Sequence, residues 1–391
     1  MSKTLYLLIL YIINAQAWGL RITDMDFDNW VVLNLIYLLI GFFYFGKMSS
    51  FSWFSLKLKY WWWWVAGIFL SMLTANYFYN QSVLQSLITY REQLLLVTIP
   101  VLFKIKPDKS DIEKSLMLFS LFLWIIYFVR LMNPDLFNYD EETIEKLYNG
   151  QASVIAGWTI MMLLTPFYLE RLKEKHDIKS LLIVFFCFLF AFLLENRSML
   201  FSVTILIGWT MLTIKNKNNW IVVLTMAIIV AMVAYSTIDV WNALFEETSI
   251  QVEDEEYNRN KAIKYFLFEA SPSIWCYIFG NGFLSTHATS LMQDMMAAGV
   301  YNSDVGFIGY WNQFGIIPII VFLMMLIPAA IGKRCSYAVR CIALIILMCS
   351  FTSSYFGIYY MRLFFCMFYY LYYLDLEERT HGIVEKPIIE T

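Results

Sequence analysis

The chain has 391 residues and a net charge of −3, with 60% of its residues hydrophobic and only 15% charged. A soluble domain of ordinary composition is roughly a quarter charged, so the composition excludes the soluble enzyme folds, and no nucleic-acid partner is expected. Uncharged apolar stretches of about 20 residues recur along the chain, which is the length that an α-helix needs to cross a bilayer. The sequence therefore predicts an all-α, polytopic integral membrane protein.

Charged or turn-rich breaks divide the chain into twelve predicted transmembrane helices. They lie near residues 4–20, 30–46, 60–79, 82–103, 115–132, 151–169, 180–196, 198–214, 220–238, 305–331, 337–354 and 357–374. Residues 1–238 therefore hold the first nine helices, residues 239–304 form one long outer loop, and residues 305–374 hold the last three. Residues 375–391 are a polar tail that we expect to be disordered.

The basic residues predict the orientation of these helices. If the N-terminus is cytoplasmic, the cytoplasmic loops and both tails hold 18 of the 28 Lys and Arg residues, and every cytoplasmic loop carries positive charge, as the positive-inside rule requires. The first helix also resembles a secretory signal that ends at Ala15-Gln16-Ala17. An uncleaved helix is favoured there, and cleavage would leave the other eleven helices in the same orientation. Both termini are thus expected in the cytoplasm.

The long outer loop carries short elements of its own. An acidic stretch over residues 246–256 leads into NRNKAIKYFLFEA, Pro272 and the apolar run IWCYIFGNGF. A short amphipathic helix is predicted next, with Ser285 or Thr286 as its N-cap and Gly299 beyond its end. Its Met-rich face lies either on a lipid surface or against the ends of other helices, and the second arrangement is favoured.

Lysine and arginine are distributed differently between the two sides. Of the 18 lysines, 15 are predicted to be cytoplasmic. Six of the ten arginines instead fall in outer loops or in the outer parts of helices, namely Arg21, Arg91, Arg130, Arg197, Arg259 and Arg362. Topology needs only positive charge, which lysine supplies. The arginine bias therefore indicates a task for a planar, permanently charged guanidinium, such as two-pronged binding of phosphate or carboxylate.

Two of these arginines lie inside predicted spans. Arg91 is about nine residues from the outer end of its helix, or roughly 14 Å deep, and Arg362 is about one and a half turns inside. A buried cation in a spanning helix costs at least about 2.5 to 3.5 kcal/mol, so it should face a cavity or a partner. The alternative for Arg91 is a carboxylate on another helix, since the neighbouring Glu92 points about 100° away and is a poor partner.

The other arginines also have structural alternatives. Arg130 at an outer helix end is long enough to snorkel to the lipid headgroups. Arg197 stands at a very tight outer turn, where Glu195 is a local ion-pair partner. Arg259 follows the acidic stretch of the outer loop and is placed to neutralise it. The three histidines, His176, His287 and His381, show no metal-ligand spacing, and no cofactor is expected.

Short motifs between residues 194 and 318 resemble a known family. The tight outer turn carries Arg197-Ser198, the outer loop carries Arg259 and a Phe-Gly-x-Gly element at residues 279–282, and Ser303-Asp304-Val305-Gly306 enters a helix with Asn312 and Gly315. This layout resembles the O-antigen and capsule polysaccharide polymerases and the related O-antigen ligases. The resemblance implies an integral-membrane glycosyltransferase of the bacterial inner membrane that takes its donor and acceptor glycans from undecaprenyl diphosphate on the periplasmic side. A chain-length regulator is a further candidate partner.

The expected chemistry assigns roles to these residues. Transfer from a lipid diphosphate requires stabilisation of the leaving diphosphate, which fixed guanidinium groups in a dry cavity provide better than solvent does. The candidates are Arg91, Arg197 and Arg259, with Arg130 and Arg362 in reserve. The acceptor hydroxyl needs a group that takes its proton. The candidates are Asp304, His287 and Glu195. Asp304 comes first because it stands at the mouth of a helix, although it also suits an N-cap for a helix that begins near Val305.

Three other activities are alternatives to that of a polymerase. The ligases usually carry a His-Asn pair where this chain has Ser303-Asp304, and His287 lies 17 residues before Asp304, so the polymerase is favoured. A lipid-oligosaccharide flippase would be expected to show repeated halves and charges that continue across the midplane, and neither is visible in the sequence. A membrane O-acyltransferase would be expected to carry a histidine within or beside the spans.

Overall fold

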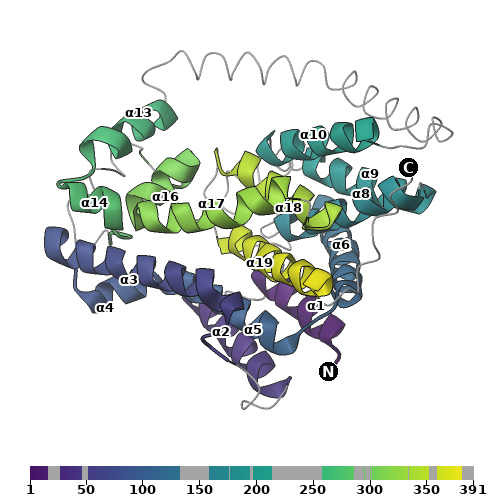
Figure 1. Ribbon diagram of the computed structural model, residues 1–391, viewed down its shortest axis with the longest axis horizontal. Helices are drawn as coiled ribbons and strands as arrows, with labels where there is room; N and C mark the ends of the chain where they lie inside the picture. The colour runs from purple at the N-terminus through teal and green to yellow at the C-terminus, as the bar shows by residue number, and fades with distance from the viewer. Residues whose placement is uncertain are drawn as a thin grey trace.

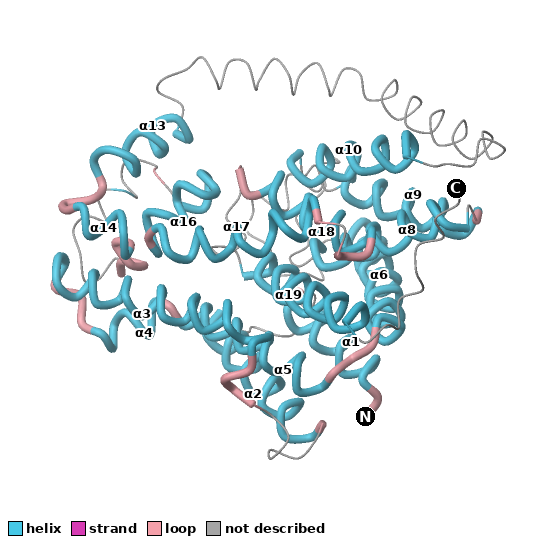
Figure 2. The backbone as a smooth tube through the Cα atoms, in the orientation of Figure 1, coloured by secondary structure: helices cyan, strands magenta, loops and turns pink. Residues whose placement is uncertain are grey.

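We describe the protein from a computed structural model (Figure 1), which covers residues 1–15, 27–45, 52–132, 158–175, 177–193, 197–213, 258–285, 295, 300, 302–332, 334–351 and 359–380. Within these residues all regular structure is helical and no strand occurs (Figure 2). The all-α prediction is thereby confirmed for the described part of the chain.

The described helices follow one another in this order: α1 (Lys3–Asn14), α2 (Phe27–Tyr44), η2 (Leu56–Leu58), α3 (Lys59–Tyr79), α4 (Val83–Thr89), η3 (Arg91–Val97), α5 (Thr98–Ile105), α6 (Lys109–Met132), η5 (Trp158–Leu163), α8 (Leu164–Lys175), α9 (Ile178–Leu193), α10 (Arg197–Thr213), α13 (Asn258–Lys264), η7 (Tyr265–Glu269), α14 (Ile274–Phe279), η8 (Asn302–Val305), α16 (Gly306–Phe314), α17 (Ile316–Ile331), α18 (Tyr337–Cys349) and α19 (Tyr359–Thr380). The η elements are short 3₁₀ segments of three to seven residues, except η7, which is of π type.

Eleven of the twelve predicted helices coincide with described helices, and the one near 220–238 lies outside the described residues. Two of the eleven are not continuous, contrary to prediction. The helix predicted over 82–103 is bent by 68° between Val83–Thr89 and Arg91–Ile105. The helix predicted over 305–331 breaks at Gly315, whose φ of +77° is a left-handed conformation that an α-helix cannot contain. The estimate of 14 Å for the depth of Arg91 assumed a straight helix, so the bend invalidates it.

The number of membrane spans stays a prediction. Among the described helices, one segment, Lys109–Val129, is long and apolar enough to cross a bilayer alone, and the bent pair would be a second if it forms one span. Six further apolar helices have 10 to 17 residues. Helices α3 and α19 have 21 and 22 residues, but polar tips of Trp and Tyr and the charges near the end of α19 lower their mean hydropathy.

Helix α19 is the centre of the bundle. Every side chain from Met361 to Tyr372 is buried, and α19 packs against α5, η3, η5, α18 and α1 (Figure 1). A helix that is apolar on all faces is stable only when other helices surround it. Its buried tyrosines donate to backbone carbonyls of its neighbours, as Tyr369 does to Lys57 at 2.7 Å and Tyr370 to Pro107 at 2.7 Å.

The predicted disordered tail begins too early, because α19 continues through Thr380. Lys109 Nζ lies 2.7 Å from Asp375 and 2.6 Å from Glu378, and Lys57 pairs with Glu377. Asp375 also accepts from the backbone N–H of Ser336 at 2.6 Å. Carboxylates near a helix C-terminus are unfavourable unless cations compensate them, so these lysines stabilise the last turns of α19.

The helix ends that the predicted orientation assigns to the cytoplasm lie together. Lys3 donates to the carbonyl of Lys106 at 2.6 Å, Thr4 donates to Asp111 at 2.8 Å, and Arg171 pairs with Glu113. We call this end of the bundle, with Lys57, Lys109 and their partners on α19, the basic end. The contacts agree with the predicted alternation of the helices, while their position relative to a membrane stays a prediction.

Substitution of Gly309 in α16 would test how closely η8 packs on this helix. A Cβ atom at Gly309 would lie 1.9 Å from the carbonyl oxygen of Asn302, whereas one at Gly208 in α10 would meet nothing within 4 Å. We expect Gly309→Ala to lower the stability by about 1 to 3 kcal/mol and Gly208→Ala to leave it unchanged or raised by up to about 1 kcal/mol. Thermal unfolding in detergent measures both. Equal midpoints for the two variants would contradict the described packing.

Candidate functional site

The Phe-Gly-x-Gly element lies at the end of the bundle opposite the basic end, directly after α14. Gly280 and Gly282 have φ angles of +87° and +80°. The turn thereby presents two backbone N–H groups to the end of α16, where Asn281 donates to the carbonyl of Asn312 at 2.7 Å and Gly282 to that of Gln313 at 2.9 Å. The Phe-Gly-x-Gly element and the helix that carries Asn312, which are far apart in the sequence, are therefore in direct contact.

The close approach of these two backbones requires glycine on both sides. A Cβ atom at Gly280 would lie 2.3 Å from the carbonyl oxygen of Gln313, and one at Gly315 would lie 2.2 Å from that of Ile278. No side chain fits into either space without a shift of the backbone. The glycines that the sequence marks as a motif thus hold the outer loop against the break between α16 and α17.

The same turn is hydrogen-bonded to the bend between α4 and η3. Tyr90, the last residue before Arg91, accepts from the backbone N–H of Phe283 at 2.5 Å and lies 2.9 Å from the hydroxyl of Ser71. Gln81 donates to the carbonyl of Phe283 at 3.1 Å and accepts from the N–H of Ser285 at 2.8 Å. The outer loop is thus fixed to the segment that carries Arg91.

Arg91 and Arg362 meet at this bend. Arg362, only 1% exposed, donates to the backbone carbonyl of Glu92 at 2.6 Å and lies 3.3 Å from its carboxylate. Arg91 is half-buried and donates to the carbonyl of Ile88, in the last turn of α4, at 2.8 Å. Glu92, a poor partner for Arg91, is therefore the partner of Arg362 on a distant helix. For Arg91, the alternative of a carboxylate on another helix stays a prediction.

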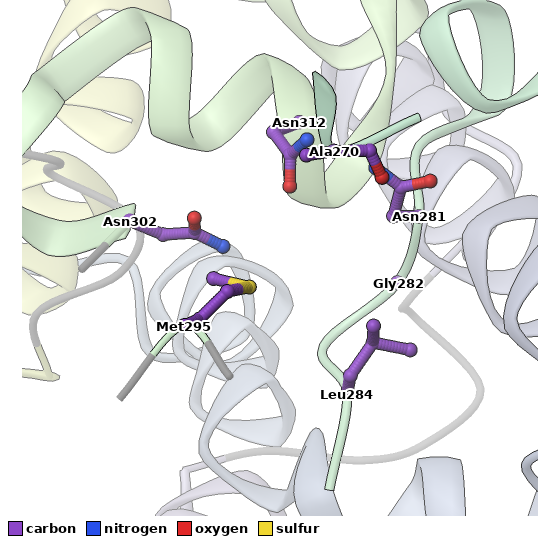
Figure 3. A pocket seen from close by; sticks show the side chains of 7 residues that line it. All are labelled: Ala270, Asn281, Gly282, Leu284, Met295, Asn302 and Asn312. Carbon is purple, nitrogen blue, oxygen red and sulfur yellow. The ribbon is translucent and has the colours of Figure 1, made fainter. Parts of the chain in front are cut away.

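A small cavity lies between the turn and α16 (Figure 3). Its volume is about 10 Å³, and its lining consists of Ala270, Asn281, Gly282, Leu284, Met295, Asn302 and Asn312. Figure 3 shows that Asn302 and Asn312 approach the cavity from η8 and α16, whereas the carboxamide of Asn281 turns away from it. The carboxamide of Asn281 accepts from Tyr79 at 2.8 Å and donates to Ser271 at 3.0 Å. No charged side chain is among the described residues that line the cavity.

The remaining predicted site residues are placed only in part. The backbones of Arg130, Arg197, Arg259 and Asp304 lie in α6, α10, α13 and η8, but the positions of their side chains fall outside the described residues. His287 and Glu195 lie outside the described residues altogether. The meeting of Arg91, Arg197 and Arg259 in one cavity therefore stays a prediction, while Arg91 and Arg362 are brought to one bend.

The structure bears on three further predictions, which concern Asp304, the turn before Arg197 and the Met-rich face of the outer loop. The N-cap of α16 is Val305, so the N-cap role considered for Asp304 is wrong. α9 ends at Leu193 and α10 begins at Arg197, so the predicted tight turn falls on the three residues between them, which lie outside the described residues. Of the Met-rich face, Met295 is described and is buried in a small core with Ala262, Phe266, Ala270, Val300 and Val305. That residue therefore confirms packing against other helices.

Sequence analysis missed the contributions of Glu92, Tyr90 and Asn302. Glu92 had a usable signal, because a carboxylate beside Arg91 within an apolar run is itself expensive to bury and implies a cationic partner. Tyr90 and Asn302 had none, since an isolated tyrosine or asparagine near a helix end has many equally good structural roles.

Comparison with known proteins adds no relative: no protein-family model matches the chain, and no curated protein matches it significantly in sequence.

Because Arg362 and Glu92 form a buried ion pair, we expect the stability lost in the double variant to differ from the sum of the losses in the two single variants. Arg362→Met leaves Glu92 without its cation, and Glu92→Gln leaves a buried guanidinium uncompensated, so each should lower the stability by about 3 kcal/mol or more. The double variant should lose less than the sum of the two. The exposed pair of Lys57 and Glu377 is the control, and Lys57→Met should cost less than about 1 kcal/mol. Additive losses in thermal unfolding at positions 92 and 362 would show that the two side chains are not coupled.

Proposed function

We propose that the chain is a polytopic glycosyltransferase of the bacterial inner membrane that polymerises polysaccharide repeat units from undecaprenyl diphosphate-linked oligosaccharides at the periplasmic face. The proposal includes twelve membrane spans with both termini in the cytoplasm.

Apolar side chains on the outside of the bundle support the membrane location. Helix α2 exposes Val32, Ile36, Leu39, Ile40 and Phe43, which recur every three or four residues along one face. Exposed apolar residues also line one side of α6, α9, α10 and α17. Continuous apolar surface of this kind is unfavourable in water and favourable in acyl chains.

The observation that carries the proposal is the convergence of three separate motifs. The Phe-Gly-x-Gly turn and the following Phe283 are hydrogen-bonded both to Tyr90, at the bend that carries Arg91, and to the last residues of α16 at one end of the bundle. The Phe-Gly-x-Gly element and the helix with Asn312 are among the motifs in which the sequence resembles the polysaccharide polymerases and ligases, whereas Arg91 belongs to the separate arginine bias on the outer side. Their assembly is the arrangement that a single active site would need.

The proposed reaction divides its tasks among these residues. A hydroxyl oxygen of the acceptor glycan attacks the anomeric carbon of the donor, a new glycosidic bond forms, and the bond to the diphosphate breaks. The hydroxyl proton passes to Asp304, with His287 and Glu195 as alternatives. Guanidinium groups of Arg91, Arg197 and Arg259 balance the charge on the leaving undecaprenyl diphosphate.

The ion pair with Glu92 changes the role proposed for Arg362, which was a reserve candidate for diphosphate binding. Arg362 is already bound to Glu92, so it is better suited to fix the bend beside Arg91 than to bind phosphate. The ligase alternative stays open, because it requires the same donor and the same outer face. The flippase alternative is less well supported, since the described charged residues gather at the two ends of the bundle.

Substitution of single arginines tests the proposed role. In a strain that depends on this gene, Arg197→Ala or Arg259→Ala with normal protein levels should leave single repeat units in place of long chains, as electrophoresis of the surface polysaccharide would show. Arg→Lys should also fail if two-pronged phosphate binding matters. Lys261→Ala, on the same helix as Arg259, is the matched control and should retain long chains. Long chains in both alanine variants would refute the role of these arginines.

The lipid-linked pool separates the polymerase from the ligase. Loss of a polymerase leaves single repeat units on the carrier, because no bond between units forms. Loss of a ligase leaves long chains on the carrier, because polymerisation continues and transfer stops. Extraction and mass spectrometry of the carrier lipids from a deletion strain measure this difference, and long carrier-bound chains would overturn the polymerase assignment.

A further inference from the structure

Two polar atoms at the cavity beside the Phe-Gly-x-Gly turn have no hydrogen-bond partner. They are Oδ1 of Asn302 and Nδ2 of Asn312, and both are buried. Asn312 is only 8% exposed, and both residues line the cavity of about 10 Å³ (Figure 3). Buried polar atoms of this kind are expensive when they stay unsatisfied, so a group that hydrogen-bonds to these two carboxamides from the cavity would be stabilised there.

The pair selects the chemistry of that group. Oδ1 of Asn302 only accepts hydrogen bonds and Nδ2 of Asn312 only donates them. A hydroxyl group complements both, because it donates its proton to the first and accepts from the second. A volume of about 10 Å³ is close to the minimum for one water-sized group, so it admits a hydroxyl but not a whole sugar ring.

A phosphate group of the carrier does not fit this cavity. The described residues of the lining carry no positive charge, and Oδ1 of Asn302 would repel an anion. The cavity is therefore distinct in its chemistry from the arginine-bearing bend, although the Phe-Gly-x-Gly turn hydrogen-bonds to both of its walls. Asn302 and the proposed base Asp304 belong to the same short helix, η8.

We propose that Asn302 and Asn312 bind one hydroxyl group of the acceptor glycan and so position the acceptor beside Asp304. This inference rests on the proposed function. The same pair of atoms would also suit a structural water molecule, and the experiment has to distinguish these two sources of the hydroxyl.

Binding of two lipids to the purified protein in nanodiscs provides the test. The first is the pool of lipid-linked repeat units extracted from a strain that lacks this gene, and the second is undecaprenyl diphosphate without sugar. Asn312→Leu should weaken binding of the glycan-bearing lipid about tenfold and leave binding of the sugar-free lipid unchanged. Asn302→Leu should do the same, and because Asn302 is only partly buried, it serves if Asn312→Leu fails to fold.

Gln313→Leu is the matched control, since Gln313 is the neighbouring buried carboxamide and does not line the cavity. It should leave the ratio of the two affinities unchanged. If the asparagine variants fold and bind the glycan-bearing lipid as the unchanged protein does, the cavity holds only water and the inference is overturned. If the unchanged protein binds neither lipid, the proposed function itself is overturned, which is a different result.

Discussion

Hydrogen bonds between the Phe-Gly-x-Gly turn and the interrupted helix of α16 and α17 are the constraint on which this end of the bundle depends. A helix that breaks inside an apolar bundle leaves N–H and C=O groups that water does not reach. Here the turn after α14 offers the N–H groups of Asn281 and Gly282, and the end of α16 offers the carbonyls of Asn312 and Gln313. The turn thus supplies hydrogen-bond donors to the carbonyl groups that the break after α16 leaves without helical partners. The position of Asn312 at the cavity follows from this pairing, and the approach of the two backbones explains why glycine occupies positions 280 and 315.

A third break brings charge into the same region. The bend after Tyr90 is held by the outer loop through Phe283 and by α19 through Arg362. Because Glu92 balances Arg362 within the protein, the pair adds no net charge to the region. In the proposed function, the attraction for the diphosphate comes from Arg91, Arg197 and Arg259, which stand on three different helices. This division gives Arg362 a positioning role that its burial alone did not predict.

The sequence predicted the helices well and their interruptions poorly. Apolar runs of about 20 residues are distinctive, so eleven helices coincide with described ones. The bend at Tyr90 has no proline within it, and Gly315 resembles any helical glycine until its φ is known. The sequence also does not indicate that Glu92 pairs with Arg362, since the two residues are 270 positions apart in the chain. The last turns of α19 were misjudged because polar residues imply disorder only when no partner compensates them, and Lys109 does so for Asp375 and Glu378.

The distribution of buried charge argues for chemistry on one side rather than transport across the bundle. In the described part of the chain the buried charged side chains are Lys104 and Asp375 at the basic end and Arg362 at the opposite end. Between Arg362 and Asp375, α19 carries only apolar and aromatic residues, and nearly all of them are buried. A carrier that moves a diphosphate through the bundle would need compensating charge along its path, because an unpaired anion in this core is prohibitively expensive. An enzyme that keeps the diphosphate at one face needs charge only there, and the proposed function assigns Arg91, Arg197 and Arg259 to that face.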